Sequence, residues 1–69
     1  MIVTGLSRGA ELVTSTSPPH VVVPYEHTGN VRWLIEELAE IRLTLADPDV
    51  QPPEMTEVGL LIHCVPLEV

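Results

Sequence analysis

The sequence has no lysine and no phenylalanine, and it has one residue each of cysteine, tryptophan and tyrosine. The single Cys64 excludes a disulfide within the chain, so no covalent bridge can stabilise the fold. Against ten acidic residues there are only three basic ones, all arginine, which gives a formal net charge of -7. Because so few cationic side chains are present to neutralise phosphates, we expect direct binding neither to nucleic acid nor to a membrane surface.

Long hydrophobic runs are also missing. No stretch reaches the roughly 18 apolar residues that a membrane-spanning helix needs. The first residues, Met1 to Gly5, carry no basic side chain, so they do not resemble a secretory signal. We therefore expect a cytoplasmic protein, or a component of something that is assembled in a cytoplasm.

The length of 69 residues predicts one small domain over 1–69 and is too short for most enzyme folds. Hydrophobic residues make up 45% of the chain, which is too many for a disordered tail. A domain of this size buries only about 60% of the surface that its unfolded chain exposes, so such chains often gain stability from a metal, a disulfide or a partner. We expect association with a partner or with a second copy.

The N-terminal part predicts three short strands. Alternating residue types over 2–15, with a turn that ends at Gly9, predict a β-hairpin. The β-branched run Val21 to Val23 predicts a strand over 20–24. That strand should end at Pro24, because proline cannot donate a hydrogen bond to a neighbouring strand.

The clearest predicted element is an amphipathic helix over 30–46, which Thr28 or Asn30 can cap. Its apolar residues recur at spacings of three and four and are Val31, Leu34, Leu38, Ile41 and Leu45. An acidic, proline-rich linker over 47–55 follows, and then a strand over 56–65. Since that strand is apolar on both faces, it should be covered on two sides or lie centrally in a sheet.

The expected fold class is α+β. The order β-β-β-α-β predicts a small mixed or antiparallel sheet of three to four strands packed against one helix. If the strands over 20–24 and 56–65 pair in parallel around the helix, their crossover should be right-handed.

Two catalytic motifs overlap near the N-terminus. Gly5-Leu6-Ser7-Arg8-Gly9 fits the G-x-S-x-G pattern and resembles the nucleophile elbow of α/β-hydrolases. From Val3 onward the same stretch is similar to the glycine-rich opening of short-chain dehydrogenases. Both families require a helix directly after the turn, whereas Glu11 begins a stretch that favours strand and loop, and its carboxylate would repel a pyrophosphate. We therefore expect a hairpin turn here, and no catalytic residue or cofactor.

The zinc-compatible residues have unsuitable spacing. His20 and His27 lie roughly 20 Å apart if the chain between them is extended. His63 and Cys64 are neighbours on a predicted strand and point to opposite faces. The acidic residues between 47 and 57 lack the spacing of an EF-hand. We expect no metal site, and Cys64 is predicted to be a small core residue.

The predicted helix gives the best indication of an interaction surface. With Leu38 at the centre of the buried face, Trp33 and Leu43 fall roughly 140° away, on the two flanks of the back. Glu36 and Glu40 lie between them. Trp33 is either tucked against the edge of the sheet or exposed as an anchor, and an exposed tryptophan ringed by polar groups is a typical interface hot spot.

The negative charge is concentrated in the C-terminal third, because residues 47–69 contain no lysine or arginine. Such a surface suits a basic partner. We therefore predict a non-enzymatic acidic protein–protein interaction module that acts as an inhibitor or adaptor on a larger protein. The predicted interface comprises Trp33, Glu36, Glu40, Leu43, Asp47, Asp49, Glu54 and Glu57.

The predicted partner is a basic protein, such as one that normally holds nucleic acid. Inhibitors encoded by phages are similar in size and charge. The alternative is a homo-oligomeric structural or assembly subunit, for example a small phage virion component. In that case the strand over 56–65 and the run Val21 to Val23 would join neighbouring copies edge to edge. The sequence leaves the partner, the oligomeric state and the strand order open.

Overall fold

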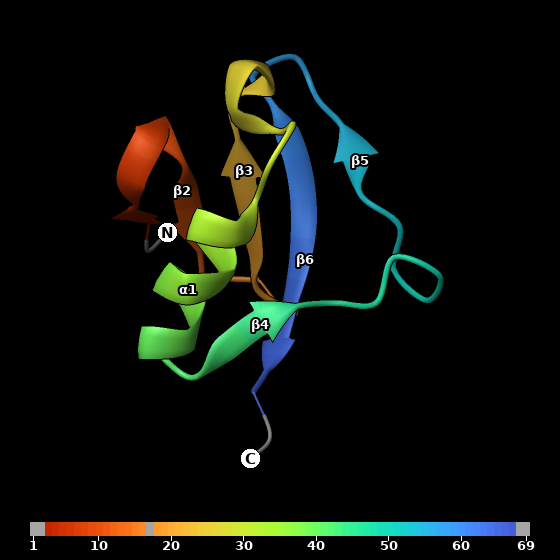
Figure 1. The fold of residues 1–69 in the computed structure, drawn as a ribbon. Helices are drawn as coiled ribbons and strands as arrows, with labels where there is room; N and C mark the ends of the chain where they lie inside the picture. Colours follow the sequence, from red (N-terminus) through yellow and green to blue (C-terminus); the bar gives the residue numbers. More distant parts are fainter. Residues whose placement is uncertain (1–2, 17, 68–69) are drawn as a thin grey trace.

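A computed structural model describes residues 3–16 and 18–67, which form strands on one side and a helix on the other (Figure 1). The strands are β1 (Val3–Gly5), β2 (Glu11–Val13), β3 (His20–Val23), β4 (Leu43–Leu45), β5 (Glu54–Met55) and β6 (Leu60–Pro66). The α-helix is α1 (Arg32–Glu40), and the two short 3-10 helices are η1 (Ser7–Gly9) and η2 (Tyr25–His27).

The strands form one antiparallel sheet in the order β1-β2-β3-β6-β4. Strand β3 pairs with one edge of β6. The other edge is shared, because β5 pairs with Leu60 and Leu61 and β4 pairs farther along, between Cys64 and Pro66. The longest strand, β6, is therefore an interior strand that is paired along both edges, as its apolar sequence predicted.

The expected α+β class is confirmed, but the sheet has more than the expected three to four strands. The two additional strands are β4, which falls within the predicted helix, and β5, which falls within the predicted linker. Because β3 and β6 are antiparallel, the parallel pairing considered for these two segments does not form.

The helix is shorter than the predicted range 30–46. At its start, the Asn30 side-chain oxygen accepts a hydrogen bond from the backbone N–H of Arg32 at 3.0 Å, which satisfies one of the free donors of a first turn. The helix ends two residues before Arg42, whose φ of 63° is left-handed, a conformation common just after a helix. The next residues, Leu43–Leu45, then pair with β6 instead of continuing the helix.

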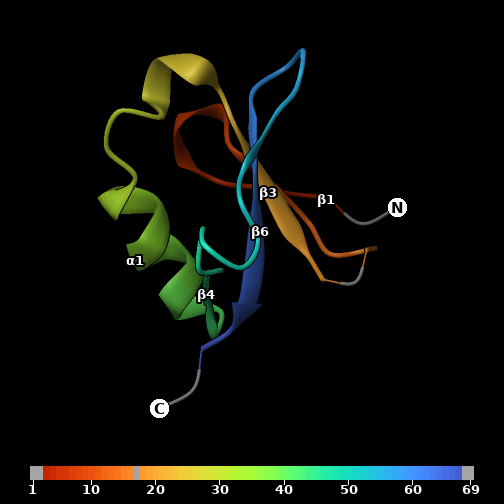
Figure 2. The ribbon, with the colours of Figure 1, turned by 90° about the vertical axis from the view of Figure 1, so that its right-hand side faces the viewer.

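The core lies between α1 and one face of the sheet (Figure 2). The largest fully buried side chains are Leu12, Leu34, Leu38, Val21, Val23 and Cys64. Alternate residues of β3 and β6 face the helix, and Leu34 and Leu38 face the strands because they lie one turn apart. Burial of each leucine contributes about 1.5–3 kcal/mol relative to an exposed position.

Gly59 is buried just before β6, against the backbone of β3. A Cβ atom at this position would collide with the carbonyl group of Val23 and would crowd a methyl group of Val22. Glycine is therefore required by the close approach of two backbones.

Gly59→Ala should destabilise the fold by about 1–3 kcal/mol, the usual cost of overpacking a tight site. Urea unfolding followed by circular dichroism measures this change. Gly29→Ala is the matched control, because a Cβ atom at Gly29 meets nothing within 4 Å. Equal unfolding midpoints for the two variants would contradict the close approach at Gly59.

Candidate functional site

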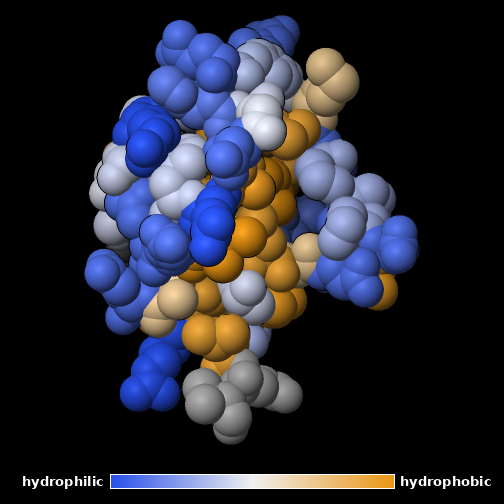
Figure 3. Space-filling model, in the orientation of Figure 1, coloured by the Kyte–Doolittle hydropathy of each residue, from blue (hydrophilic) through white to orange (hydrophobic). Residues whose placement is uncertain are grey.

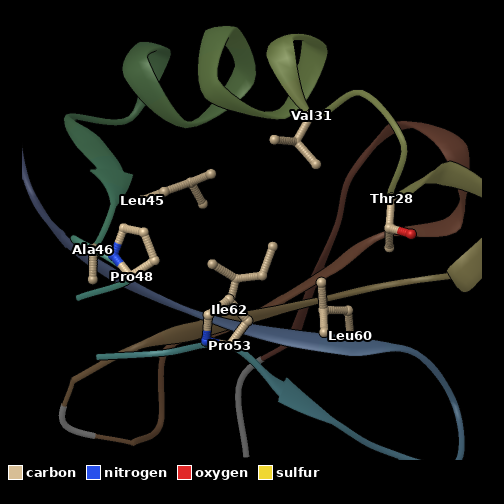
Figure 4. Close-up of a pocket in the computed structure, with 8 residues that line it drawn as sticks. All are labelled: Thr28, Val31, Leu45, Ala46, Pro48, Pro53, Leu60 and Ile62. Atoms are coloured by element: carbon tan, nitrogen blue, oxygen red, sulfur yellow. The ribbon is translucent and has the colours of Figure 1, made fainter. Parts of the chain in front are cut away.

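An open apolar pocket of about 250 Å³ lies between the start of α1, the end of β4 and β6 (Figure 4). Its lining residues are Thr28, Val31, Leu45, Ala46, Pro48, Pro53, Leu60 and Ile62. None of these side chains titrates. The one hydroxyl, on Thr28, already donates to the backbone oxygen of Tyr25 at 2.9 Å. The pocket therefore suits an apolar group and offers no acid, base or metal ligand.

The pocket forms where α1 no longer covers the face of the sheet. Leu34 and Leu38 of α1 are fully buried in the core, whereas Leu60 and Leu45 are only partly buried at its margin. The loop after β4 approaches from the other side through Pro48 and Pro53, which are themselves exposed. In Figure 3 a band of hydrophobic atoms runs down the middle of this face, between hydrophilic surfaces on its two sides.

The segment beside the pocket, residues 47–59, is acidic and mostly exposed; we call it the acidic segment. Its carboxylates, Asp47, Asp49, Glu54 and Glu57, are all exposed. Three of its apolar side chains also face solvent, with exposed fractions of 75% for Val50, 81% for Met55 and 76% for Val58. The acidic segment thus combines negative charge with uncovered apolar surface.

The predicted interface residues on the helix have different environments. Trp33 is partly buried and packs against the core, and the guanidinium carbon of Arg8 lies 4.8 Å from its ring centroid. Leu43 belongs to β4, not to the helix, and is also partly buried against the core. Glu36 and Glu40 are exposed on α1. Trp33 therefore occupies a position between the two predicted alternatives of a buried and an exposed ring.

The G-x-S-x-G stretch forms η1, the connection between β1 and β2, and β2 follows it in place of a helix. The backbone N–H and the hydroxyl of Ser7 both donate to Glu37 Oε1, at 3.2 and 2.7 Å. Arg8 takes a φ of 57° and reaches over Trp33, one helical turn before Glu37. The turn is thereby fixed to α1, and its serine has a structural partner.

Ser7→Ala should lower the free energy of unfolding by about 1 kcal/mol, because it removes one of two hydrogen bonds to a carboxylate at an exposed site. Urea unfolding measures the change, and Ser15→Ala, at an exposed loop position, is the control. If both variants unfold at the same urea concentration, the contact of Ser7 with Glu37 does not stabilise the fold.

His20 and His63 lie directly opposite each other across β3 and β6. The sequence pattern addressed only the spacing of His20 from His27, because short patterns do not reveal which strands pair or in which register. His20 Nδ1 lies 3.0 Å from Thr16 Oγ1, and His63 Nε2 lies 4.0 Å from a Glu54 carboxylate oxygen. Within residues 3–16 and 18–67, no group of three or more histidine, cysteine or acidic residues could hold a metal ion.

Cys64 is fully buried in the core, next to Ile62 on β6. Burial raises the pKa of its thiol from the ordinary 9.0 to about 11, because a thiolate is poorly solvated there. At neutral pH the side chain is a protonated thiol, which is a weak nucleophile. It serves as a core residue.

This raised pKa predicts a loss of stability in alkali. The folded chain keeps the thiol proton up to about pH 11, while the unfolded chain releases it near 9.0. The stabilisation is therefore complete below pH 9 and is lost as the pH rises through 11, by about 3 kcal/mol in total. Urea unfolding at pH 8 to 11 measures it, and Cys64→Ala should show a correspondingly shallower decline. Parallel declines would contradict the raised pKa.

Comparisons with known proteins do not narrow the function. No family model matches the chain, and neither a curated protein nor a solved structure shows a significant match. In the part of the chain that the structure describes, no helix is long and apolar enough to cross a membrane.

Proposed function

We propose that this chain is a small, non-enzymatic protein–protein interaction module that acts as an inhibitor or adaptor on a larger protein with a basic surface. The observation that carries this proposal is the overlap of uncovered apolar side chains with negative charge on the acidic segment. Apolar contact supplies most of the affinity of an interface. Complementary charge supplies rapid encounter and selects the partner.

The state of the reactive side chains supports binding over catalysis. Ser7 is hydrogen-bonded to Glu37, and Cys64 is buried with its pKa raised. The pocket lining has no titratable group. An enzyme that used this pocket would therefore have to bring its acid, base or nucleophile from elsewhere.

The charge distribution supports a basic partner. From Leu43 to Leu67 the sequence has four carboxylates and no lysine or arginine. These carboxylates therefore lack a cation from their own part of the chain, and a partner's lysines or arginines can approach them. A protein that normally holds nucleic acid presents such a surface.

The homo-oligomeric subunit is a second candidate, and the open face of the sheet favours it. Val22, Leu61 and Val65 alternate with core residues and so point away from α1. Val22 and Leu61 are direct partners across β3 and β6 and make a small apolar patch, with Glu11 and Glu54 as their outer partners in the same row. The same patch of a second copy is a suitable cover for it.

The charge of the acidic segment provides the test of the first candidate. Asp49→Asn combined with Glu57→Gln removes two exposed charges from it, and Glu11→Gln combined with Glu26→Gln removes two exposed charges elsewhere. We expect the chain, immobilised at low salt, to capture one basic protein from a lysate of its own organism. In titrations with that purified protein, the first variant should bind about tenfold more weakly, since each surface pair is worth up to about 1 kcal/mol, and the second variant should be unchanged.

Two results would contradict the proposal. One is capture that is insensitive to salt and equal for both charge variants, because charge would then play no part. The other is an ordered oligomer whose mass, measured by light scattering, is independent of salt and of dilution. That second result would favour the structural subunit.

A further inference from the structure

We propose that the pocket between α1, β4 and β6 holds one aliphatic side chain from a segment of the partner whose neighbouring residues are basic. This inference rests on the proposed function and specifies its recognition site. The pocket volume of about 250 Å³ is below the range of roughly 300–1,000 Å³ that is typical of sites for drug-sized ligands and cofactors. It is large enough for a leucine-sized group.

The chemistry of the lining selects an aliphatic occupant. Val31, Leu45 and Ile62 present only carbon to the pocket, and the Thr28 hydroxyl is already bonded to Tyr25. An occupant with polar atoms would leave them without partners, which costs free energy. An aliphatic side chain has no polar atom to desolvate on entry and gains from leaving water.

The two sides of the pocket carry charges of opposite sign. On the loop side, Asp47 lies between the lining residues Ala46 and Pro48, and Glu54 follows the lining residue Pro53. On the helix side, the lining residue Val31 is followed by Arg32. The basic neighbours of the inserted side chain should therefore lie over the loop side, away from Arg32.

The carboxylates of the loop side are accessible to a partner. Asp47 Oδ1 accepts a hydrogen bond from the backbone N–H of Asp49 at 2.9 Å, which fixes this carboxylate in place. Its exposure and that of Glu54 leave both able to contact a cation. One Glu54 carboxylate oxygen lies 4.0 Å from His63 Nε2. A basic segment is thus favoured over an acidic or neutral one.

Strands and prolines restrict part of the pocket lining, which favours binding. Leu45 lies on β4, Leu60 and Ile62 lie on β6, and Val31 directly precedes α1. Between β4 and β5 the lining includes Pro48 and Pro53, whose rings restrict the backbone. Filling the pocket therefore costs less conformational entropy than ordering a flexible loop would. A second copy is a poor occupant, since each chain carries a net charge of -7 and like charges repel.

Three pentapeptides blocked at both ends test the occupant against the isotope-labelled protein by chemical-shift titration. The first has a central leucine between arginines, the second replaces the leucine by alanine, and the third replaces the arginines by glutamates. We expect the first to shift the amide signals of Val31, Leu45 and Leu60. It should bind about tenfold more tightly than the second, which lacks most of the apolar group, and the third should not saturate at low salt.

Pro53→Trp fills the pocket from its rim and should weaken binding of the leucine peptide about tenfold or more. Val58→Trp places the same side chain at a position that is 76% exposed and outside the pocket lining, and it should leave binding unchanged. The dispersion of the amide spectrum reports whether each variant is folded. If Pro53→Trp does not fold, Pro48→Trp fills the pocket from the other exposed lining residue.

The outcomes separate this inference from the proposed function. Equal binding of the leucine and alanine peptides, or unimpaired binding to Pro53→Trp, overturns the pocket assignment even if a basic protein is captured through the acidic segment. Binding of the leucine peptide in the pocket without capture of any basic protein supports the assignment and overturns the proposed function. Self-association that perturbs the pocket amides would show that a second copy is the occupant and would overturn the inference.

Discussion

Nine residues of helix face a sheet that is five strands wide, and the helix cannot cover all of it. With its side chains a helix is roughly 10–12 Å across, whereas five strands span roughly 19 Å between the outer two. The helix lies against the strands that supply Leu12, Val21 and Val23, and these are fully buried with Leu34 and Leu38. Toward β5 and the loop before it the cover ends, and there the pocket opens. The width of one helix therefore decides both where the core is complete and where an apolar surface is left.

Strand β6 extends from the part of the sheet that the helix covers to the part that it leaves uncovered. Its residues Leu60, Ile62 and Cys64 point toward the helix, and Leu61 and Val65 point to the opposite face. One strand thus contributes to the core, to the floor of the pocket and to the open face of the sheet. Because β3, β4 and β5 all pair with β6, its position is determined along both edges. The pocket floor is accordingly among the most constrained parts of the chain.

The sequence predicted the local features well, since local features depend on neighbouring residues. The start of the helix, the strand that ends at Pro24 and the exposure of the acidic segment follow from patterns a few residues long. The end of the helix does not follow from such short patterns, because Leu43 and Leu45 fit both a helical spacing and a strand alternation. Pairing with Cys64 to Pro66, about twenty residues away, selects the strand. The pocket was unpredictable for the same reason, because its lining extends from Thr28 to Ile62.

The pocket and the acidic segment would contribute to different steps of the proposed interaction. Exposed carboxylates act over roughly a Debye length of 8–10 Å, so they mainly raise the rate of encounter and orient a basic partner. A side chain enclosed in an apolar pocket is removed from water and must be re-exposed before the complex dissociates, so it mainly lengthens the lifetime. Neither feature suffices alone: surface charge pairs are weak, and a pocket for a single side chain discriminates poorly among proteins. In the proposed interaction their proximity, at Asp47 beside Pro48 and Glu54 beside Pro53, would give so small a chain the means to be selective.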